Sequence, residues 1–405
     1  MEKLPQGFSV MATRCAIGKK KKEDLGMIYC EVPAVGAAVF TTNKVKAAPV
    51  LVSREKLRNS RVQAVVVNSG CANACTGKRG LKDARDTAII TSGLLGIKKD
   101  DVFVSSTGLI GSFLPMDKIK KGIKRLCGEI KVKKTSDVYG FARAIMTTDT
   151  VDKVLTRQFK ILNKKITVTG FAKGAGMICP DMATMLSFIV SDVKISAPML
   201  KKALRDAVDG SFNMLTVDGD TSTNDTVLVL ANGRAGNKNI IKDGTDFLKF
   251  SKCLNEVSSS LAAMIARDGE GATKLTHITV KGASSFSEAK KGALTVANSS
   301  LVKTALFGRD PNWGRIVAAI GRAGIDMDQD RLDVYITSMG SGESTKVKLV
   351  KGGCGASFDI RKARNILNKK ELEIIIDLKM GRYEASVFTC DLTSGYIKIN
   401  AHYTT

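Results

Sequence analysis

The stretch KITVTGFAKGAGMICPDMATMLSFIVSDV, residues 165–193, contains two runs rich in β-branched and aromatic residues. Residues 165–176 and 184–193 therefore have the composition of β-strands. The first run ends in the glycines Gly174 and Gly176, and between the two runs lies the segment MICPDMA with a single proline, Pro180. Glycine and proline permit or impose unusual backbone conformations. We therefore expect an unusual backbone where the two predicted strands are joined, and this junction is where the search for the fold and for the chemistry begins.

Strand-like and helix-like segments alternate outward from this junction, which predicts an α/β fold with mixed sheets layered with helices. A chain of 405 residues exceeds what one core usually fills, so two domains are expected. Further strands are predicted at 62–70, 101–111, 332–338, 372–381, 384–393 and 396–403. Helices are predicted at 81–96, 116–126, 198–208 and 246–266.

The composition is typical of a folded, soluble protein, with 44% hydrophobic and 25% charged residues. There is no apolar run near the roughly 18 residues of a membrane helix, and the N-terminus lacks a secretory signal. We therefore expect a cytoplasmic protein that contacts no membrane. The nine scattered cysteines fit reduced thiols, and only two histidines are available as imidazole ligands, so neither a metal nor a cofactor is expected.

The formal net charge of +24 is the unusual bulk property. Such a charge could attract nucleic acid or anionic small molecules. The lysines are dispersed, however, and aromatics make up only 5%, which argues against a nucleic-acid module. The densest run, Lys19–Lys22, predicts a solvated loop.

The sequence offers no ordinary base for a serine or threonine nucleophile. His277 lies in the alternating run KLTHITV, which favours a structural role, and His402 is three residues from the end. No familiar hydrolase motif or phosphate-binding loop is present. Any acyl-transfer chemistry would therefore need a base other than histidine.

A threonine whose own α-amine is the base meets that need, because an α-amine has a pKa near 8. Thr184 would gain a free amine if the bond after Ala183 broke. The small Ala183 leaves its carbonyl open to attack by the Thr184 hydroxyl. Taken by themselves, these residues still favour the plainer interpretation, a threonine that opens a buried strand.

The motifs as a set decide between these interpretations. The chain resembles the ornithine acetyltransferases, also called bifunctional arginine biosynthesis or glutamate N-acetyltransferase proteins, from about Gly7 to Thr405. The blocks that carry the resemblance, in order, are NSGCANACTG (68–77), SSTGLIG (105–111), MTTDT (146–150), KGAGMICPDMATML (173–186), TVDGDTSTNDT (216–226), RDGEGATK (267–274), LVKTALFGRDPNWGRI (301–316) and INAHYTT (399–405).

The resemblance implies the self-processing fold shared with certain aminopeptidases, and autoproteolysis between Ala183 and Thr184. The products would be an α chain of 1–183 and a β chain of 184–405, assembled as two α and two β chains. Thr184 would be the nucleophile, and Thr107 with Gly108 would form the oxyanion hole. The implied substrate contacts are Thr147, Lys173, Thr184, Glu270, Asn400 and Thr405.

The implied reaction is a ping-pong cycle in which N2-acetylornithine acetylates Thr184 and glutamate then collects the acetyl group. Lys173 is the expected cation for the α-carboxylate that both substrates share. Glu270 could pair with the ornithine ammonium but would repel the glutamate side chain, and the group that offsets this repulsion is left open. So is the use of acetyl-CoA as a second donor, which would add amino-acid N-acetyltransferase activity.

Two segments carry further expectations. The last residues of a chain are usually frayed, whereas the resemblance implies that Asn400 and Thr405 fold into the active site. TVDGDTSTNDT lacks the spacing of a calcium loop and predicts a hydrogen-bonded turn network near that site. GRDPNWGRI predicts a rigid structural turn.

Two alternative functions come from other classes. A self-cleaving aminopeptidase of similar architecture would release acyl groups to water, but those relatives generally use serine where this chain has Thr184. A basic nucleic-acid-binding protein without catalysis would keep one intact chain and show salt-sensitive binding to DNA or RNA.

Overall fold

A computed structural model of the chain describes residues 2–18, 22–132, 136–179, 185–340 and 345–402. The strands of a first sheet are β1 (Phe8–Thr13), β2 (Leu25–Phe40), β3 (Arg61–Asn68), β4 (Val102–Ser106), β5 (Lys153–Ile161), β6 (Lys164–Lys173), β7 (Leu186–Ser191) and β8 (Thr226–Ala231). Its helices are α1 (Ala48–Lys56), α2 (Gly77–Leu95), α3 (Met116–Val132), α4 (Val138–Ala144), α5 (Ala197–Asp209) and α6 (Thr245–Arg267). Short 3-10 turns cover Leu57–Asn59, Lys99–Asp101, Phe212–Met214 and Gln329–Arg331.

The first sheet is mixed and has the order β4-β3-β2-β8-β7-β6-β5. The long strand β2 organises it, because its first half pairs with β1 and its second half with β8 along the same edge, while β3 occupies the other edge. Strands β3 and β4 are parallel, as are β7 and β8, and the other pairs in this sheet are antiparallel.

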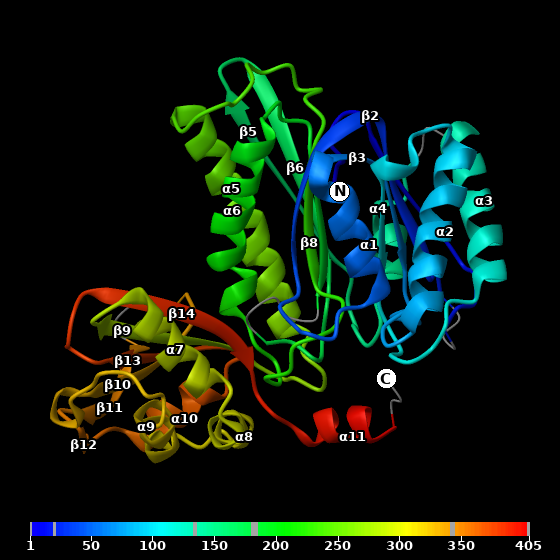
Figure 1. Ribbon diagram of the computed structural model, residues 1–405. Coiled ribbons are helices and arrows are strands. Elements are labelled where there is room, and N and C mark those ends of the chain that lie inside the picture. Colours follow the sequence, from blue (N-terminus) through cyan, green and yellow to red (C-terminus); the bar gives the residue numbers. More distant parts are fainter. Residues whose placement is uncertain (1, 19–21, 133–135, 180–184, 341–344, 403–405) are drawn as a thin grey trace.

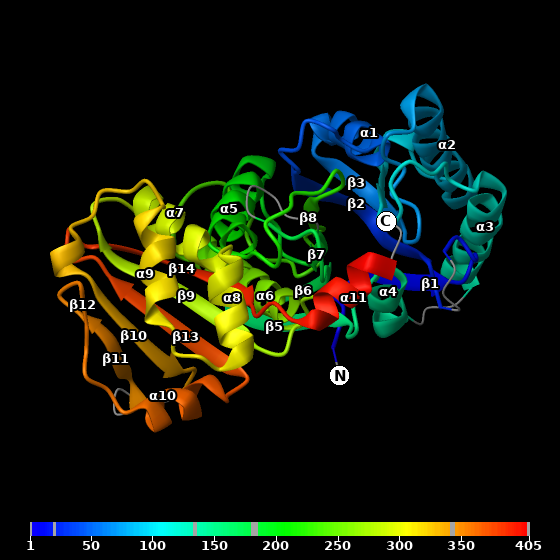
Figure 2. The same cartoon turned by 90° about the horizontal axis from the view of Figure 1, so that it is seen from below.

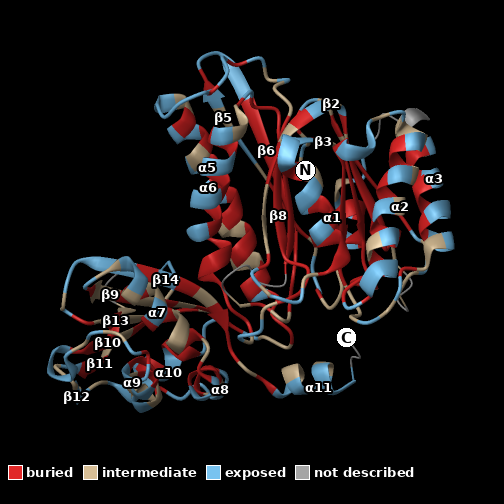
Figure 3. Cartoon of the chain, viewed as in Figure 1, coloured by how far each residue is buried: buried red, intermediate tan, exposed pale blue. Residues whose placement is uncertain are grey.

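The two halves of this sheet face each other across one apolar cluster. Phe103 of β4 lies in the same cluster as Phe171 of β6 and Phe188 of β7, and Phe141 of α4 packs edge-on against the latter two rings. Helices α5 and α6 cover the outer side of one half, and α1, α2 and α3 that of the other. Figure 1 shows the resulting layers of helix, strand, strand and helix, and Figure 3 shows that the strands between the helices are almost entirely buried.

A second sheet forms a separate layer below the first (Figure 1). Its order is β12-β11-β10-β13-β9-β14. The strands are β9 (Leu275–Ala283), β10 (Asp333–Ser338), β11 (Val347–Lys351), β12 (Cys354–Gly355), β13 (Glu371–Asp377) and β14 (Tyr383–Cys390). Alternate residues of β13 are buried, as expected for a sheet with one face in a core. The helices that fill this core are α7 (Phe286–Ala297), α8 (Ser300–Gly308), α9 (Trp313–Gly321) and α10 (Ile360–Leu367).

The predicted α/β class with mixed sheets is confirmed, and most predicted elements lie within a few residues of the observed ones. The prediction of a strand at 396–403 is wrong, because Ser394–His402 form helix α11. Strand β14 already ends at Cys390, and the Thr393 hydroxyl accepts the Gly395 N–H, which starts a helical turn. The alternating pattern of YIKIN had suggested a strand, but in α11 no described side chain is buried.

Helix α11 returns from the second sheet to the open end of the first (Figures 1 and 2). The predicted cut between 183 and 184 does not coincide with the boundary between the sheets. It falls inside the first sheet, between the neighbouring strands β6 and β7. Among the described helices, none is both long enough and apolar enough to span a bilayer.

Candidate active site

One pocket of about 120 Å³ gathers residues from blocks that are far apart in the sequence. Its lining residues come from the ends of β4 and β6, the turns after α4 and before β8, the loop after α6, and α11. The predicted site residues among them are Thr107, Gly108, Thr147, Lys173, Glu270 and Asn400. The described part of the chain thus brings six of the predicted positions to one place.

The turn after β4 presents Thr107 and Gly108 to this pocket. Gly108 has φ +127°, and a Cβ atom there would lie 2.5 Å from the backbone carbonyl carbon of Gly70, so only glycine fits. The Thr107 N–H donates to the Asn68 carbonyl at 2.9 Å. The Thr107 hydroxyl lines the pocket and, within the described residues, has no hydrogen-bond partner. It is therefore available to a ligand.

Buried amides hold this turn in place. The Asn68 side chain donates to the Cys71 carbonyl at 2.9 Å and accepts the Ser106 hydroxyl at 2.6 Å. The Asn224 side chain donates to the carbonyls of Ala72 and Ser106 at 2.7 and 2.8 Å. The blocks NSGCANACTG, SSTGLIG and TVDGDTSTNDT thus form one hydrogen-bonded unit, and the predicted turn network near the site is present.

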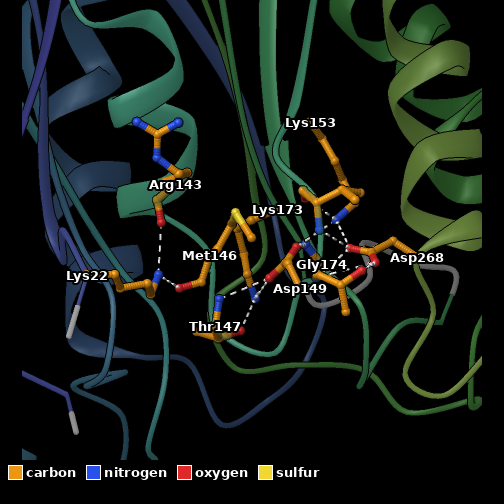
Figure 4. Close-up of polar contacts among 11 residues, drawn as sticks. Lys22, Arg143, Met146, Thr147, Asp149, Lys153, Lys173, Gly174 and Asp268 are labelled. Atoms are coloured by element: carbon orange, nitrogen blue, oxygen red, sulfur yellow. Dashed lines mark hydrogen bonds and ion pairs between the residues drawn. The ribbon is translucent and has the colours of Figure 1, made fainter. Parts of the chain in front are cut away.

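Lys173, at the end of β6, is the cationic side chain among the described lining residues. Its ammonium donates to the Thr147 hydroxyl at 2.8 Å and lies 3.9 Å from a carboxylate oxygen of Asp149 (Figure 4). Burial lowers the pKa of Lys173, and Asp149 opposes that effect. The position of this cation therefore depends on a residue behind the pocket wall.

Asp149 is the centre of a buried group of charges. Its carboxylate accepts the N–H groups of Gly174 at 2.6 Å and Thr147 at 2.9 Å, and the Lys153 ammonium at 2.9 Å. Lys153 also binds Asp268 at 2.5 Å (Figure 4). Burial alone would raise the pKa of Asp149, but Lys173, Lys153 and the Gly174 N–H outweigh it and hold this pKa well below its usual range.

Glu270 also lines the pocket. Its carboxylate accepts the Asn400 side-chain amide at 2.7 Å, and its backbone N–H donates to the Ala175 carbonyl at 2.8 Å. Gly176 packs so closely that a Cβ atom there would lie 2.4 Å from this carboxylate. Helix α11 therefore completes the pocket, as expected from the resemblance for Asn400.

Two aspartates anchor the chain on either side of the proposed cleavage position. Asp218 accepts the N–H groups of Met177 at 2.6 Å and Ile178 at 2.9 Å, and the Tyr396 hydroxyl at 3.2 Å. Asp225 accepts the Met185 N–H at 2.9 Å. Burial raises the pKa of both carboxyl groups. The segment 216–226 thus holds both ends of the gap in the described chain.

The lining of the pocket carries charged side chains of both signs. Lys173 supplies a positive charge, and Glu270, Asp218 and Asp220 supply carboxyl groups on the same lining. Such a lining suits a small molecule that carries both a carboxylate and an ammonium group. No group of three or more His, Cys, Asp and Glu side chains in the described ranges could hold a metal ion.

Three predicted positions, Ala183, Thr184 and Thr405, lie outside the described residues. Sequence analysis missed the site roles of Asp149, Tyr396 and Asp225. The two aspartates stand inside the quoted blocks MTTDT and TVDGDTSTNDT, where an acidic residue surrounded by threonine and asparagine was the available signal.

Three predictions made outside the pocket can also be compared with the structure. His277 has a structural role, because it packs edge-on against Phe388 at 4.4 Å between ring centroids and burial lowers its pKa to about 4. Trp313 begins α9 and packs against the second core, so the expected structural turn is present. Of the run predicted as a solvated loop, residues 19–21 lie outside the described residues, whereas Lys22 lies in a loop, is half-buried and donates to the carbonyls of Arg143 and Met146 at 2.8 and 2.5 Å (Figure 4). Those carbonyls lie at the end of α4, where a cation is favoured.

Comparison with known proteins places this architecture. The ArgJ family profile matches residues 9–405. The chain is 47% identical over 402 residues to the arginine biosynthesis bifunctional protein ArgJ of Caldanaerobacter subterraneus, covering 99% of this chain and 98% of that one. It is also 47% identical over 404 residues to the protein of the same name from Thermotoga neapolitana, covering 99% and 100%. A crystal structure of arginine biosynthesis bifunctional protein argJ from Bacillus halodurans, 39% identical, superposes with a TM-score of 0.51 over 54% of this chain and all of that chain. Similarity along almost the whole sequence shows that this chain belongs to the ArgJ family.

Proposed function

We propose that this protein is an acetyltransferase of arginine biosynthesis that moves an acetyl group from N2-acetylornithine to glutamate. The names of its relatives support the pathway. The substrates and the mechanism rest on the site. We further propose that it works in the cytoplasm as two α and two β chains, the products of cleavage between residues 183 and 184.

The observation that carries this proposal is the pocket in which Thr107, Gly108, Lys173 and Glu270 meet. Thr184 follows the lining residues Lys173, Gly176 and Met177 in the sequence. A threonine released there has both a hydroxyl nucleophile and an α-amine base. The Thr107 hydroxyl and the Gly108 backbone would stabilise the oxyanion, and one such donor is worth about 3–4 kcal/mol.

Charged side chains of both signs on the pocket lining would allow donor and acceptor to share one site. Lys173 would bind the α-carboxylate of either amino acid, and Glu270 the ornithine ammonium. Glutamate would meet the Asn400 amide, which donates to Glu270 in the unliganded site and could turn to the γ-carboxylate. The acetyl group would stay bonded to Thr184 while glutamate replaces ornithine in the pocket, so the kinetics should be ping-pong.

The test combines the mass of the purified chain with an assay of transfer. The unaltered protein should consist of residues 1–183 and 184–405 and should form N-acetylglutamate from N2-acetylornithine and glutamate. Thr184→Ala should give one intact, folded and inactive chain, whereas Thr184→Ser should still be cleaved. Intact, active wild-type protein would refute the proposal. Release of acetate without N-acetylglutamate would show a hydrolase instead, and formation of N-acetylglutamate from acetyl-CoA would reveal a second donor.

A further inference from the structure

Lys153, the first residue of β5, carries a buried positive charge close to the pocket (Figure 4). It is not among the described residues that line the pocket, and it is only 1% exposed. Its ammonium donates to Asp149 Oδ1 at 2.9 Å, to Asp268 Oδ2 at 2.5 Å and to the Val151 carbonyl at 3.3 Å. An ammonium has three hydrogens to donate, so these contacts use all of them. Lys153 therefore binds within the protein and has no hydrogen left for a ligand.

The first partner, Asp149, belongs to the part of the site that holds Lys173. Asp149 accepts the Gly174 N–H at 2.6 Å and the Thr147 N–H at 2.9 Å. Gly174 is the next residue after Lys173, and the Thr147 hydroxyl accepts the Lys173 ammonium at 2.8 Å. Asp149 therefore fixes both the backbone beside Lys173 and the hydroxyl that the Lys173 ammonium binds (Figure 4).

The second partner, Asp268, belongs to the part of the site that holds Glu270. The Asp268 carboxylate accepts the N–H groups of Thr150 at 3.0 Å and Val151 at 3.4 Å, and it also accepts the Thr150 hydroxyl. Only Gly269 separates Asp268 from Glu270 in the sequence. The loop that carries Glu270 is therefore attached, through Asp268, to the chain just before β5.

The buried charges of this group balance one another. Two lysines, Lys153 and Lys173, face two aspartates, Asp149 and Asp268, and none of the four is more than 8% exposed. Among the described residues, Lys153 is the cation that contacts both aspartates. Buried charges need partners, so loss of this ammonium would leave the two carboxylates without the cation that joins them.

We propose that Lys153 is a positioning residue that sets the spacing between two substrate contacts, Lys173 and Glu270, an inference that rests on the proposed function. If Lys173 binds the α-carboxylate and Glu270 the side-chain ammonium of ornithine, their separation has to match one amino acid. A site that already has this separation binds its ligand more tightly, because little ordering remains to be done. Lys153 maintains the separation through Asp149 on one side and Asp268 on the other.

The test compares the dissociation constants of ornithine and norvaline, which is ornithine without its side-chain amine, by titration calorimetry on the purified protein. Hydrogen bonds to charged groups typically contribute about 10–100-fold in affinity, and the wild type should prefer ornithine by such a factor. Lys153→Met keeps a side chain of similar length but loses the ammonium. In this variant the preference for ornithine should be largely lost, and norvaline should also bind more weakly.

Two aspartate variants separate the two contacts. Asp268→Asn should reduce the preference for ornithine but leave the affinity for norvaline unchanged, because the contacts of Asp149 with Lys173 stay intact. Asp149→Asn should weaken the binding of norvaline. The matched control is Asp333→Asn, a buried aspartate of the second sheet that also pairs with two lysines, at 3.2 and 2.9 Å. This control should lower the melting temperature and leave both affinities at the wild-type values.

The outcomes separate this role from the proposed function. If Lys153→Met keeps the wild-type affinities for both ligands, Lys153 has only a structural role, and the coupling is overturned while the proposed function stands. Should Lys153→Met not fold, Asp268→Asn decides, and an unchanged preference for ornithine in that variant overturns the coupling. If the wild-type protein binds neither ligand, the proposed function fails, and the coupling fails with it.

Discussion

Replacing Asp149 by asparagine tests whether the buried charges behind the pocket hold Lys173 in place. The side chain of Asp149 is fully buried between two lysines, 2.9 Å from the ammonium of Lys153 and 3.9 Å from that of Lys173. Asparagine keeps the shape, but it leaves Lys153 with Asp268 as its ion-pair partner and removes the ion-pair partner that Lys173 has among the described residues. Removing one partner of a buried ion pair typically costs about 3–5 kcal/mol. At about 2–4 °C per kcal/mol for a large domain, the melting temperature should fall by on the order of 10 °C.

The sign of the pH dependence follows from the low pKa of Asp149. A carboxyl whose folded pKa is depressed stabilises the protein above its unfolded pKa of about 3.9, and this contribution is lost as pH falls toward the folded pKa. The deficit of Asp149→Asn should therefore be complete at pH 7 and shrink below about pH 4. Because Asp149 also opposes the lowering of the Lys173 pKa, KM should rise more than kcat falls.

Thermal melts from pH 3 to 8, together with initial rates at pH 7, measure both effects. Asp243→Asn is the control, because Asp243 forms an exposed ion pair with Lys202 at 2.6 Å and such pairs are worth about 0–1 kcal/mol. If Asp149→Asn melts as the wild type does and keeps its KM, the buried charge does not position Lys173, and this reasoning is wrong.

Three further changes have definite expected outcomes. Thr107→Ala should lower kcat about 10²–10³-fold with little change in KM, as judged from initial rates, whereas Thr107→Ser should retain most activity. Asn400→Ala should raise KM because Glu270 loses its amide donor. A bulky extension after Thr405 should lower activity. Equal rates with and without the extension would contradict the role of the tail. His277→Phe should keep full activity at pH 7. Between about pH 6.5 and pH 4, the unfolded wild-type chain binds a proton at His277 that the folded chain does not bind, because burial lowers the pKa of folded His277 to about 4. The melting temperature of His277→Phe should therefore fall less than that of the wild type over this pH range.

Local patterns were sufficient for much of the fold. The helix predicted at 81–96 overlaps α2 and ends one residue beyond it, and the one at 198–208 matches α5 within a residue at each end. Both have a repeating apolar face and an ending glycine, and these signals depend only on near neighbours. The same reasoning failed at 396–403, where an alternating pattern has no sheet edge to join. A short strand exists only with a partner, and local sequence cannot supply one.

The sequence by itself determined which residue types are available for the chemistry: a threonine in a cleavable setting, a glycine turn after a strand, and few histidines. Only the tertiary structure decided that Asp149 supports Lys173 and that Asp225 lies beside Met185. Asp268 is more than a hundred residues from Lys153, and Asn400 is 130 residues from Glu270. Such pairs meet because β2 pairs with strands along both of its edges and the two halves of the first sheet share one core. Helix α11 then returns from the second sheet to the end of the first sheet where the pocket lies. Burial then changes what each carboxyl group can do, because a charge without partners is costly away from water.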